Sequence, residues 1–381
     1  MRAAARKGCG AFFLRESMKR MEGRFRLFDK KAGNGHNKTR EPTGRRRVDL
    51  SVRVNSFLGK FGFWARVKFP ALSSNAYLKL QFVTRGRMQR KYTEWFMRQQ
   101  EAPMPNVVNI ETINRCNSTC AFCTANIHAE KRPFMKIDMD LYRSIIDQLA
   151  EWGYKGHLTL YGNNEPLLDD RIVEMHRYAR EKLPDSFIFC STNGLILNME
   201  KLKALQPYID QLIINNYATS YKMHRNIQEI YDYAQAHPQE FEDVEIVIQM
   251  RYLKEVLTNR AGSAPNKQAT EKVIRETCLL PFTDMWIMPN GKVGLCCCDN
   301  FEVTDFGDLT RQSVRECWNS PKMRKVREDI AAGRQNYPFC KHCDFIDAGF
   351  RMTLVKNILA GDQEAANRSG GDQKNRLKDR R

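Results

Sequence analysis

The sequence predicts an α/β fold in which a parallel sheet is followed by a small cysteine-rich domain. Between residue 106 and about residue 250, short apolar runs alternate with amphipathic helical patterns, which is typical of βαβ units. After about residue 275 the cysteines become dense, and an Asn-Gly pair indicates a hairpin. Three further cysteines, Cys116, Cys120 and Cys123, directly follow the first apolar run. These observations set both the expected fold class and the region where chemistry is expected.

Five apolar runs are expected as strands and four amphipathic patterns as helices. The expected strands are 107–113, 157–161, 187–191, 211–215 and 244–250. The expected helices are 139–152, 171–182, 199–205 and 223–236. Residues 105–270 are therefore expected to form the α/β body, and residues 271–350 the cysteine-rich domain.

The positive charge of the chain lies at its N-terminal end. The net charge is +18, but residues 1–100 hold 25 Lys and Arg against 6 Asp and Glu, and the remainder holds 37 against 38. Residues 1–50 are expected to be a disordered basic extension, because they lack a periodic apolar pattern. Residues 51–104 are expected to be helical, and residues 351–381 a polar tail. A basic arm can bind nucleic acid, but no RNA-binding signature accompanies it, so nucleic acid is not the expected partner.

Length and cysteine content limit the class of protein. The 381 residues suit two or three domains with a sizeable core. No apolar run reaches the roughly 18 residues that a membrane-spanning helix needs. Twelve cysteines without a recognisable secretion signal predict reduced thiols that bind metal rather than disulfides, and a cytoplasmic location.

The first cysteine group has the spacing C-x3-C-x2-C. Cys116, Cys120 and Cys123 can place three thiolates around one metal centre. Iron–sulfur clusters are commonly held by four cysteine thiolates, so three leave one iron of a [4Fe–4S] cluster open to another ligand. Zinc with a fourth ligand elsewhere is the alternative, although structural zinc sites more often use paired cysteine knuckles.

This spacing, with Phe122 directly before Cys123, resembles the signature of the radical S-adenosylmethionine (radical SAM) enzymes. The resemblance implies a partial (β/α)6 TIM-like barrel, in which the open iron chelates the amino and carboxylate groups of S-adenosylmethionine. It also implies reductive cleavage of that cofactor to a 5′-deoxyadenosyl radical. In barrels of this type the reactive loops follow the C-terminal ends of the strands.

Two polar loops after expected strands strengthen the resemblance. Asn163, Asn164 and Glu165 lie in a run similar to the family's Gly-Gly-Glu-Pro motif, which contacts the cofactor's amino group. Two asparagines replace the usual glycines, and Asn tolerates left-handed backbone better than most residues. Ser191 and Asn193 lie in a loop similar to the one that contacts the ribose and the carboxylate. For each loop the alternative is a polar turn that caps the next helix.

The second cysteine group resembles the SPASM/Twitch extension of radical SAM enzymes. Its members are Cys278, Cys296, Cys340 and Cys343. The resemblance implies one auxiliary [4Fe–4S] cluster with four thiolate ligands, because the additional cysteines of the two-cluster form are absent. A zinc ribbon on the same ligands is the alternative.

Four further residues are candidate catalytic groups. Cys297 and Cys298 directly follow Cys296, and adjacent residues on a strand point to opposite faces, so not all three are expected to ligate one cluster. One of these two thiols is therefore expected to face the substrate. Arg251 and Arg260 are expected near the barrel mouth, where a guanidinium can hold a carboxylate or a hydroxyl group. The alternative interpretation is that both arginines are solvated surface residues.

The resemblance implies a radical SAM enzyme that removes a hydrogen atom from a small-molecule substrate. Oxidation of a sugar-like or aminocyclitol-like carbinol is the favoured reaction, with the auxiliary cluster accepting the second electron. A flavodoxin- or ferredoxin-like protein is the expected reductant. The alternatives are a radical epimerase with a cysteine hydrogen donor, a SPASM-type enzyme that modifies a peptide, and a zinc-binding nucleic-acid protein that is not an enzyme.

Overall fold

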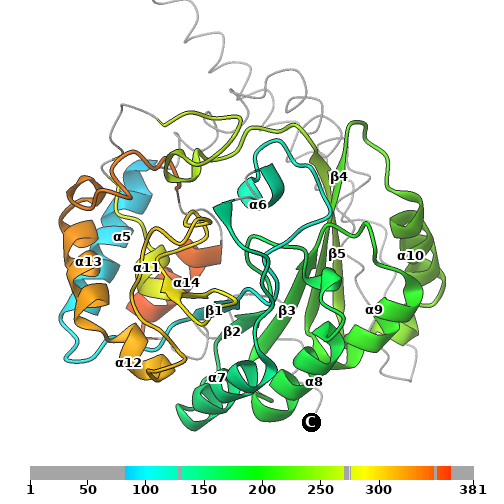
Figure 1. The fold of residues 1–381 in the computed structure, drawn as a ribbon, viewed down its shortest axis with the longest axis horizontal. Helices are drawn as coiled ribbons and strands as arrows, with labels where there is room; N and C mark the ends of the chain where they lie inside the picture. The colour runs from blue at the N-terminus through cyan, green and yellow to red at the C-terminus, as the bar shows by residue number, and fades with distance from the viewer. Residues whose placement is uncertain (1–81, 128–130, 270–273, 275, 347–349, 362–381) are drawn as a thin grey trace, which may run out of the picture. The chain divides into compact units, whose positions relative to one another are not determined.

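The computed structural model describes residues 82–361, except 128–130, 270–273, 275 and 347–349 (Figure 1). The predicted basic extension at 1–50 lies outside the described residues. So do the part of the predicted helical region before residue 82 and the part of the predicted tail after residue 361.

A seven-stranded sheet forms the centre of the described part of the chain, in the order β5-β4-β3-β2-β1-β6-β7. Its strands are β1 (Val107–Ile110), β2 (His157–Thr159), β3 (Phe187–Thr192), β4 (Gln211–Ala218), β5 (Glu245–Tyr252), β6 (Asp284–Ile287) and β7 (Val293–Gly294). Neighbouring strands are parallel, except for the antiparallel pair β6–β7. The carboxyl ends of β1 to β5 therefore meet at one edge of the sheet, as the predicted α/β barrel class requires.

Four helices cover the outer face of this sheet (Figure 1). They are α7 (Met139–Glu151), α8 (Ile172–Lys182), α9 (Met199–Leu205) and α10 (Arg225–Ala236), close to the four predicted ranges. In α7 the buried residues Tyr142, Ile145, Ile146 and Leu149 recur at helical spacing, and Asp138 caps the N-terminus through Asp140 and Leu141. The predicted helices are confirmed because each has such an apolar stripe to bury against the strands.

The predicted hairpin after residue 284 is present, but its first strand belongs to the central sheet. β6 pairs with β1 in parallel, from Val107 opposite Asp284 to Ile110 opposite Ile287, and with β7 antiparallel. The chain turns through Gly291, whose φ of +81° is accessible mainly to glycine. β6 therefore extends the sheet by one parallel strand beyond the five expected.

α6 (Thr124–Ile127) follows the first cysteine group. The other helices lie on the β6 side of the sheet (Figure 1). They are α5 (Phe82–Met97), α11 (Leu280–Thr283), α12 (Val314–Trp318), α13 (Pro321–Ala332) and α14 (Phe350–Leu359). α5 packs against both α13 and α14. The α13 residue Arg327 is held between the rings of Phe96 and Trp318, 5.2 and 4.0 Å from their centroids, and donates to the carbonyls of Pro281 and Trp318.

α14 corrects the expectation of a polar tail from residue 351. Its residues Met352, Leu354, Val355 and Ile358 are buried in the core. These apolar side chains pack on α5, and that tertiary contact orders a segment whose flanking sequence is polar.

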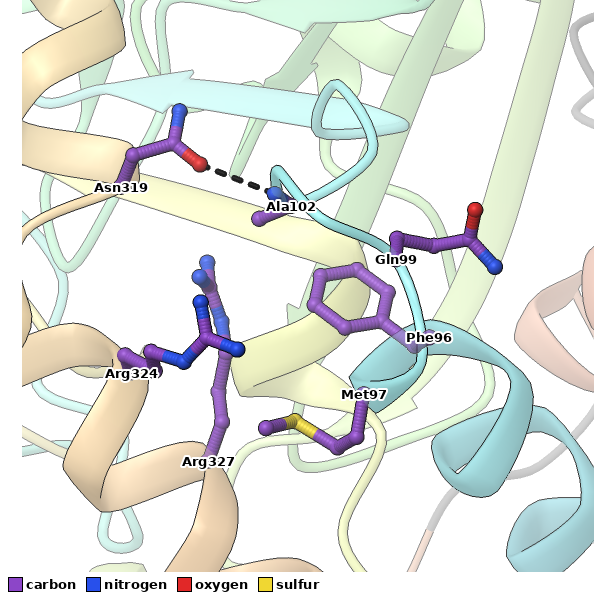
Figure 2. Close-up of a pocket in the computed structure, with 7 residues that line it drawn as sticks. All are labelled: Phe96, Met97, Gln99, Ala102, Asn319, Arg324 and Arg327. Atoms are coloured by element: carbon purple, nitrogen blue, oxygen red, sulfur yellow. Dashed lines mark hydrogen bonds between the residues drawn. The ribbon is translucent and has the colours of Figure 1, made fainter.

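A pocket lies between α5 and α13 (Figure 2), and beside it Asn319 Oδ1 accepts a hydrogen bond from the Ala102 amide at 2.9 Å. Its lining residues are Phe96, Met97, Gln99, Ala102, Asn319, Arg324 and Arg327, none of which was predicted to be functional. Within the described ranges, no helix is both long and apolar enough to cross a membrane.

Candidate active site

The first cysteine group occupies the loop between β1 and α6. The Ser118 amide lies 3.4 Å from Cys116 Sγ, and the Ser118 hydroxyl lies 3.2 Å from Cys120 Sγ. The Ala125 amide lies 3.5 Å from Cys123 Sγ. Hydrogen bonds to the ligand sulfurs are one of the features that tune an iron–sulfur cluster. The loop thus presents three thiols together with donors suited to a thiolate-ligated centre.

Burial favours the protonated form of Cys116 and of Cys120 in the metal-free chain. It raises the pKa of Cys116 to about 12 and that of Cys120 to about 11. Metal binding must therefore release protons, as is usual for thiolate ligands. No group of three or more Cys, His, Asp or Glu side chains in the described residues is arranged to hold a metal ion as it stands. The fit to a cluster consequently rests on the donor chemistry of the three thiols and on their hydrogen-bond donors.

The loop after β2 carries a buried carboxylate. Glu165 is 1% exposed and caps a short 3-10 turn, Pro166–Leu168. Its Oε1 accepts from Thr192 Oγ1 at 2.7 Å and its Oε2 from the Asn193 amide at 2.7 Å. Burial raises the pKa of Glu165, while these hydrogen bonds act in the opposite direction. Glu165 therefore ties the loops after β2 and β3 together.

The loop after β3 reaches the first cysteine group. Asn193 Nδ2 lies 3.6 Å from Cys116 Sγ and donates to Asn117 Oδ1 at 2.8 Å. Ser191 Oγ accepts from Asn215 Nδ2 at 3.1 Å, which adds β4 to the same network. Asn193 Oδ1 also accepts from the Leu195 amide at 2.9 Å, so this side chain both shapes its own turn and reaches the first cysteine group.

Gly194 holds this loop in a conformation that a larger residue strains. Its φ is +75°, and an added Cβ would lie 2.7 Å from Ile227 Cδ1 and 2.8 Å from Ile214 Cγ2. We expect Gly194→Ala to lower the free energy of unfolding by about 1–3 kcal/mol, seen as a lower urea midpoint of the metal-free protein. Gly86→Ala is the matched control, because Gly86 lies inside α5 with nothing within 4 Å of its added Cβ. The control is expected to raise stability by up to about 1 kcal/mol, and equal midpoints for the two variants would contradict this account.

A cavity that opens to solvent lies at the edge where the parallel strands end. Ten of the residues predicted from the sequence line it: Cys116, Cys120, Cys123, Phe122, Asn163, Asn164, Glu165, Ser191, Asn193 and Arg260. Tyr161, Asn215 and Tyr217 also line it and were not predicted, and the Phe122 and Tyr217 rings pack 5.6 Å apart. Tyr161 and Asn215 end two of the expected strands, which was their signal in the sequence, whereas Tyr217 lies two residues beyond the expected strand 211–215.

The two candidate arginines have different environments. Arg251 forms an ion pair with the buried Glu255 and lies 5.5 Å over the Tyr217 ring. Arg260 lines the cavity, and its Nη1 donates to Asn163 Oδ1 at 2.6 Å and to the Cys297 carbonyl at 3.1 Å. Arg251 thus supports a wall of the cavity, whereas Arg260 faces the cavity itself.

Arg260 is also held in an unusual backbone conformation. Its φ is +47°, and the next residue, Ala261, has a φ of +54°. Non-glycine residues in the left-handed region are strained by about 1–3 kcal/mol each and cluster at functional sites. The strain places the Arg260 guanidinium between the loop after β2 and the second cysteine group.

Three members of the second cysteine group, Cys296, Cys340 and Cys343, lie close to one another. Burial raises the pKa of Cys340, and Cys296 and Cys343 raise it further electrostatically. The neighbouring thiols of Cys296, Cys297 and Cys343 likewise raise the pKa of Cys298. The fourth expected ligand, Cys278, is buried in the same hydrophobic core, two residues before α11.

The expected strand geometry of Cys296, Cys297 and Cys298 is wrong. β7 ends at Gly294, and the three cysteines follow in a turn that the Asp299 amide closes onto the Cys296 carbonyl at 3.0 Å. In a turn the side chains do not alternate, and the Cys298 thiol therefore lies near those of Cys296 and Cys343. Cys297 is partly exposed, and its carbonyl accepts from Arg260 and Asn163.

Comparisons with known proteins agree with this arrangement. The Radical SAM superfamily matches residues 110–244, and the SPASM iron-sulfur cluster-binding domain matches residues 278–344. The S-adenosyl-L-methionine-dependent 2-deoxy-scyllo-inosamine dehydrogenase of Niallia circulans is 23% identical over 241 residues, which is 63% of this chain and 92% of the relative.

Two solved structures extend the comparison. The crystal structure of BtrN in complex with AdoMet and 2-DOIA has a TM-score of 0.55 and 23% identity, over 64% of this chain and 94% of that chain. Streptococcus suis SuiB bound to precursor peptide SuiA has a TM-score of 0.37 and 13% identity, over 74% of this chain and 79% of that chain. The first of these structures shares the fold.

The two domain matches lead to one assignment, with which the thiol donors of the two cysteine groups agree. The chain belongs to the radical SAM superfamily and is an S-adenosylmethionine-dependent enzyme with two [4Fe–4S] clusters, the second in a C-terminal SPASM-type domain.

Proposed function

We propose that the protein oxidises a carbinol of a sugar-like or aminocyclitol-like small molecule. The observation that carries the proposal is Arg260, a guanidinium that faces the cavity and also contacts the loop that bears the second cysteine group. The 2-deoxy-scyllo-inosamine dehydrogenase named above, whose substrate is an aminocyclitol, supports the same reaction class.

Each loop of the cavity has a separate binding task in this proposal. Cys116, Cys120 and Cys123 hold the first cluster, and Glu165 with its neighbouring loop binds the ammonium group of S-adenosylmethionine. Ser191 and Asn193 bind its ribose and carboxylate. Asn163, Asn164 and Phe122 complete the walls. When bound, the first cluster and S-adenosylmethionine supply a 5′-deoxyadenosyl radical.

The overall electron balance is that of a dehydrogenase. Bound S-adenosylmethionine would supply the acceptor for a hydrogen atom from the substrate carbon, solvent would take the hydroxyl proton, and the auxiliary cluster would supply the acceptor for the remaining electron. The product is a ketone or an aldehyde. Arg260 orients the hydroxyl oxygen and stabilises negative charge on it, since a guanidinium donates several hydrogen bonds in a fixed geometry. Cys278, Cys296, Cys340 and Cys343 hold the auxiliary cluster.

The proposed setting is cytoplasmic. A flavodoxin- or ferredoxin-like protein reduces the first cluster in this proposal. The absence of disulfides among the described cysteines is compatible with that compartment.

Epimerisation is the second candidate, because Cys297 is partly exposed and lies beside the Arg260 contact. A thiol there can return a hydrogen atom to the opposite face of the substrate carbon. Cys298 is the less suitable donor, because it is buried.

Turnover in deuterated water separates the two candidates. The reconstituted, reduced protein is incubated with S-adenosylmethionine and a panel of polyols that begins with 2-deoxy-scyllo-inosamine. We expect a carbonyl product, one 5′-deoxyadenosine per product, and continued turnover in Cys297→Ser and Cys298→Ser variants that retain both clusters. A product of unchanged oxidation state that carries one solvent deuterium at an inverted carbon would instead establish the epimerase.

A further inference from the structure

Glu111 and Arg132 form a buried ion pair outside the cavity. Glu111 follows β1 and is 1% exposed, and Arg132 precedes α7 and is 5% exposed. Arg132 Nη2 lies 2.6 Å from Glu111 Oε2, and Nη1 lies 3.4 Å from Oε1. Neither residue lines the cavity. A buried pair with two donor–acceptor contacts fixes geometry strongly, because each charge needs the other.

Arg132 also reaches the cysteine-rich region. Its Nη1 donates to Asn300 Oδ1 at 3.2 Å, and its Nη2 lies 3.5 Å from Glu302 Oε1. Glu302 is itself held by Asn290 of the β6–β7 hairpin at 2.7 Å. The guanidinium thus joins the barrel to the segment that directly follows Cys296 to Cys298.

Glu111 makes a second connection, toward the loop after β2. Its Oε1 accepts from the Asn163 amide at 3.2 Å. Gly162 makes this approach feasible, because an added Cβ there would lie 2.9 Å from Glu111 Cβ. The Asn163 side chain then accepts from Arg260 and donates to the Cys297 carbonyl at 3.1 Å.

These contacts form a ring that hydrogen bonds and the backbone close together. Hydrogen bonds run from Arg132 through Glu111 and Asn163 to the Cys297 carbonyl. The backbone then leads from Cys297 to Asn300, whose side chain accepts from Arg132. One side of the ring is the loop that contains Glu165, and the other is the turn that contains Cys296. The Glu111–Arg132 pair therefore stands where the two cluster-bearing parts of the chain meet.

We propose that the Glu111–Arg132 pair is a positioning element that sets the distance and orientation between the two cluster sites through Asn163 and Arg260. Both residues act through others and touch no reacting atom. The proposal rests on the proposed function, in that correct spacing couples radical formation to oxidation of the substrate. Loss of the pair lets S-adenosylmethionine be cleaved without product, because small misplacements at a reacting centre cost rate steeply.

The test compares Glu111→Gln, Arg132→Gln and the double variant with the wild-type holoenzyme. We expect product per 5′-deoxyadenosine to fall about tenfold or more in each single variant, with total 5′-deoxyadenosine largely retained. The double variant is expected to be no worse than the poorer single variant, since the two residues act as one pair. Arg132→Lys keeps the charge but not the two-pronged contact, and is expected to recover part of the coupling.

Two readouts do not depend on a substrate. The auxiliary-cluster midpoint potential is measured by an EPR redox titration, and S-adenosylmethionine affinity by titration calorimetry. We expect the potential to shift in both single variants, because Glu111 and Arg132 no longer fix Asn163 and Asn300, which lie on either side of the turn that carries the Cys296 ligand. Glu174→Gln is the matched control, since it removes the carboxylate of the exposed Arg143–Glu174 pair at 2.9 Å and should alter neither readout.

Several outcomes would overturn the proposal. An unchanged midpoint potential and unchanged coupling in both single variants would do so. Equal losses of iron content, 5′-deoxyadenosine and product would also do so, because they would indicate a purely structural pair. If the wild-type protein oxidises no polyol in the panel, the proposed function fails, while the midpoint potentials still decide whether the pair positions the two sites.

Discussion

Replacing Cys116, Cys120 and Cys123 together with alanine is expected to halve the iron content and abolish radical chemistry. After anaerobic reconstitution the wild-type chain should hold about eight irons and eight sulfides, and the variant about four of each. The variant should release no 5′-deoxyadenosine, because S-adenosylmethionine then has no iron to bind. The measurement combines iron and sulfide analysis with chromatography of the reduced reaction mixture.

Cys317→Ala is the matched control for this triple variant. Cys317 is fully buried on α12, and its carbonyl accepts from the Ser320 amide, outside both cysteine groups. Its replacement should leave iron content and 5′-deoxyadenosine unchanged. Retention of about eight irons by the triple variant would contradict the assignment of these thiols to the first cluster.

Arg260→Gln is expected to reduce oxidised product about 10²-fold while 5′-deoxyadenosine release continues. The guanidinium is the cationic side chain that lines the cavity, and an amide cannot stabilise developing charge on the substrate oxygen to the same degree. Arg260→Lys keeps the charge and should retain more activity than Arg260→Gln. The measurement is the ratio of carbonyl product to 5′-deoxyadenosine, with whichever polyol of the panel the wild-type protein oxidises.

Arg180→Gln provides the control for the change of charge. Arg180 pairs with Asp210 at 2.7 Å, is 22% exposed, and lies on α8, whose residues do not line the cavity. The control should keep the wild-type product ratio. If Arg260→Gln also keeps that ratio, Arg260 has no role in the oxidation step.

Local sequence patterns predicted much of the fold. The five expected strands and four expected helices match β1 to β5 and α7 to α10 closely. In each of them the spacing of the apolar residues alone indicates a strand or a helix. β6 was not assigned to the central sheet, since its partner β1 lies about 175 residues earlier and no local pattern encodes that pairing. α14 was taken for a polar tail because its order depends on contact with α5.

The residues of the candidate site also fall into those that local sequence patterns indicated and those that only the fold brings together. Spacing indicated the two cysteine groups, and short polar motifs after strands indicated the loops around Glu165 and Asn193. Tyr161 and Tyr217 belong to no such motif, and only the fold brings their rings to the cavity. Glu111 and Arg132 are 21 positions apart in sequence, and no short motif joins them, so their pairing is visible only in three dimensions.

Release of 5′-deoxyadenosine and methionine by the reconstituted, dithionite-reduced protein tests the central claim most directly. The measurement is made with and without the polyol panel, so it does not depend on knowing the substrate. We expect both products, in amounts that depend on the reductant and on an intact first cluster. Stoichiometric zinc in place of iron in the anaerobically purified protein, with neither product formed after reconstitution, would contradict the account.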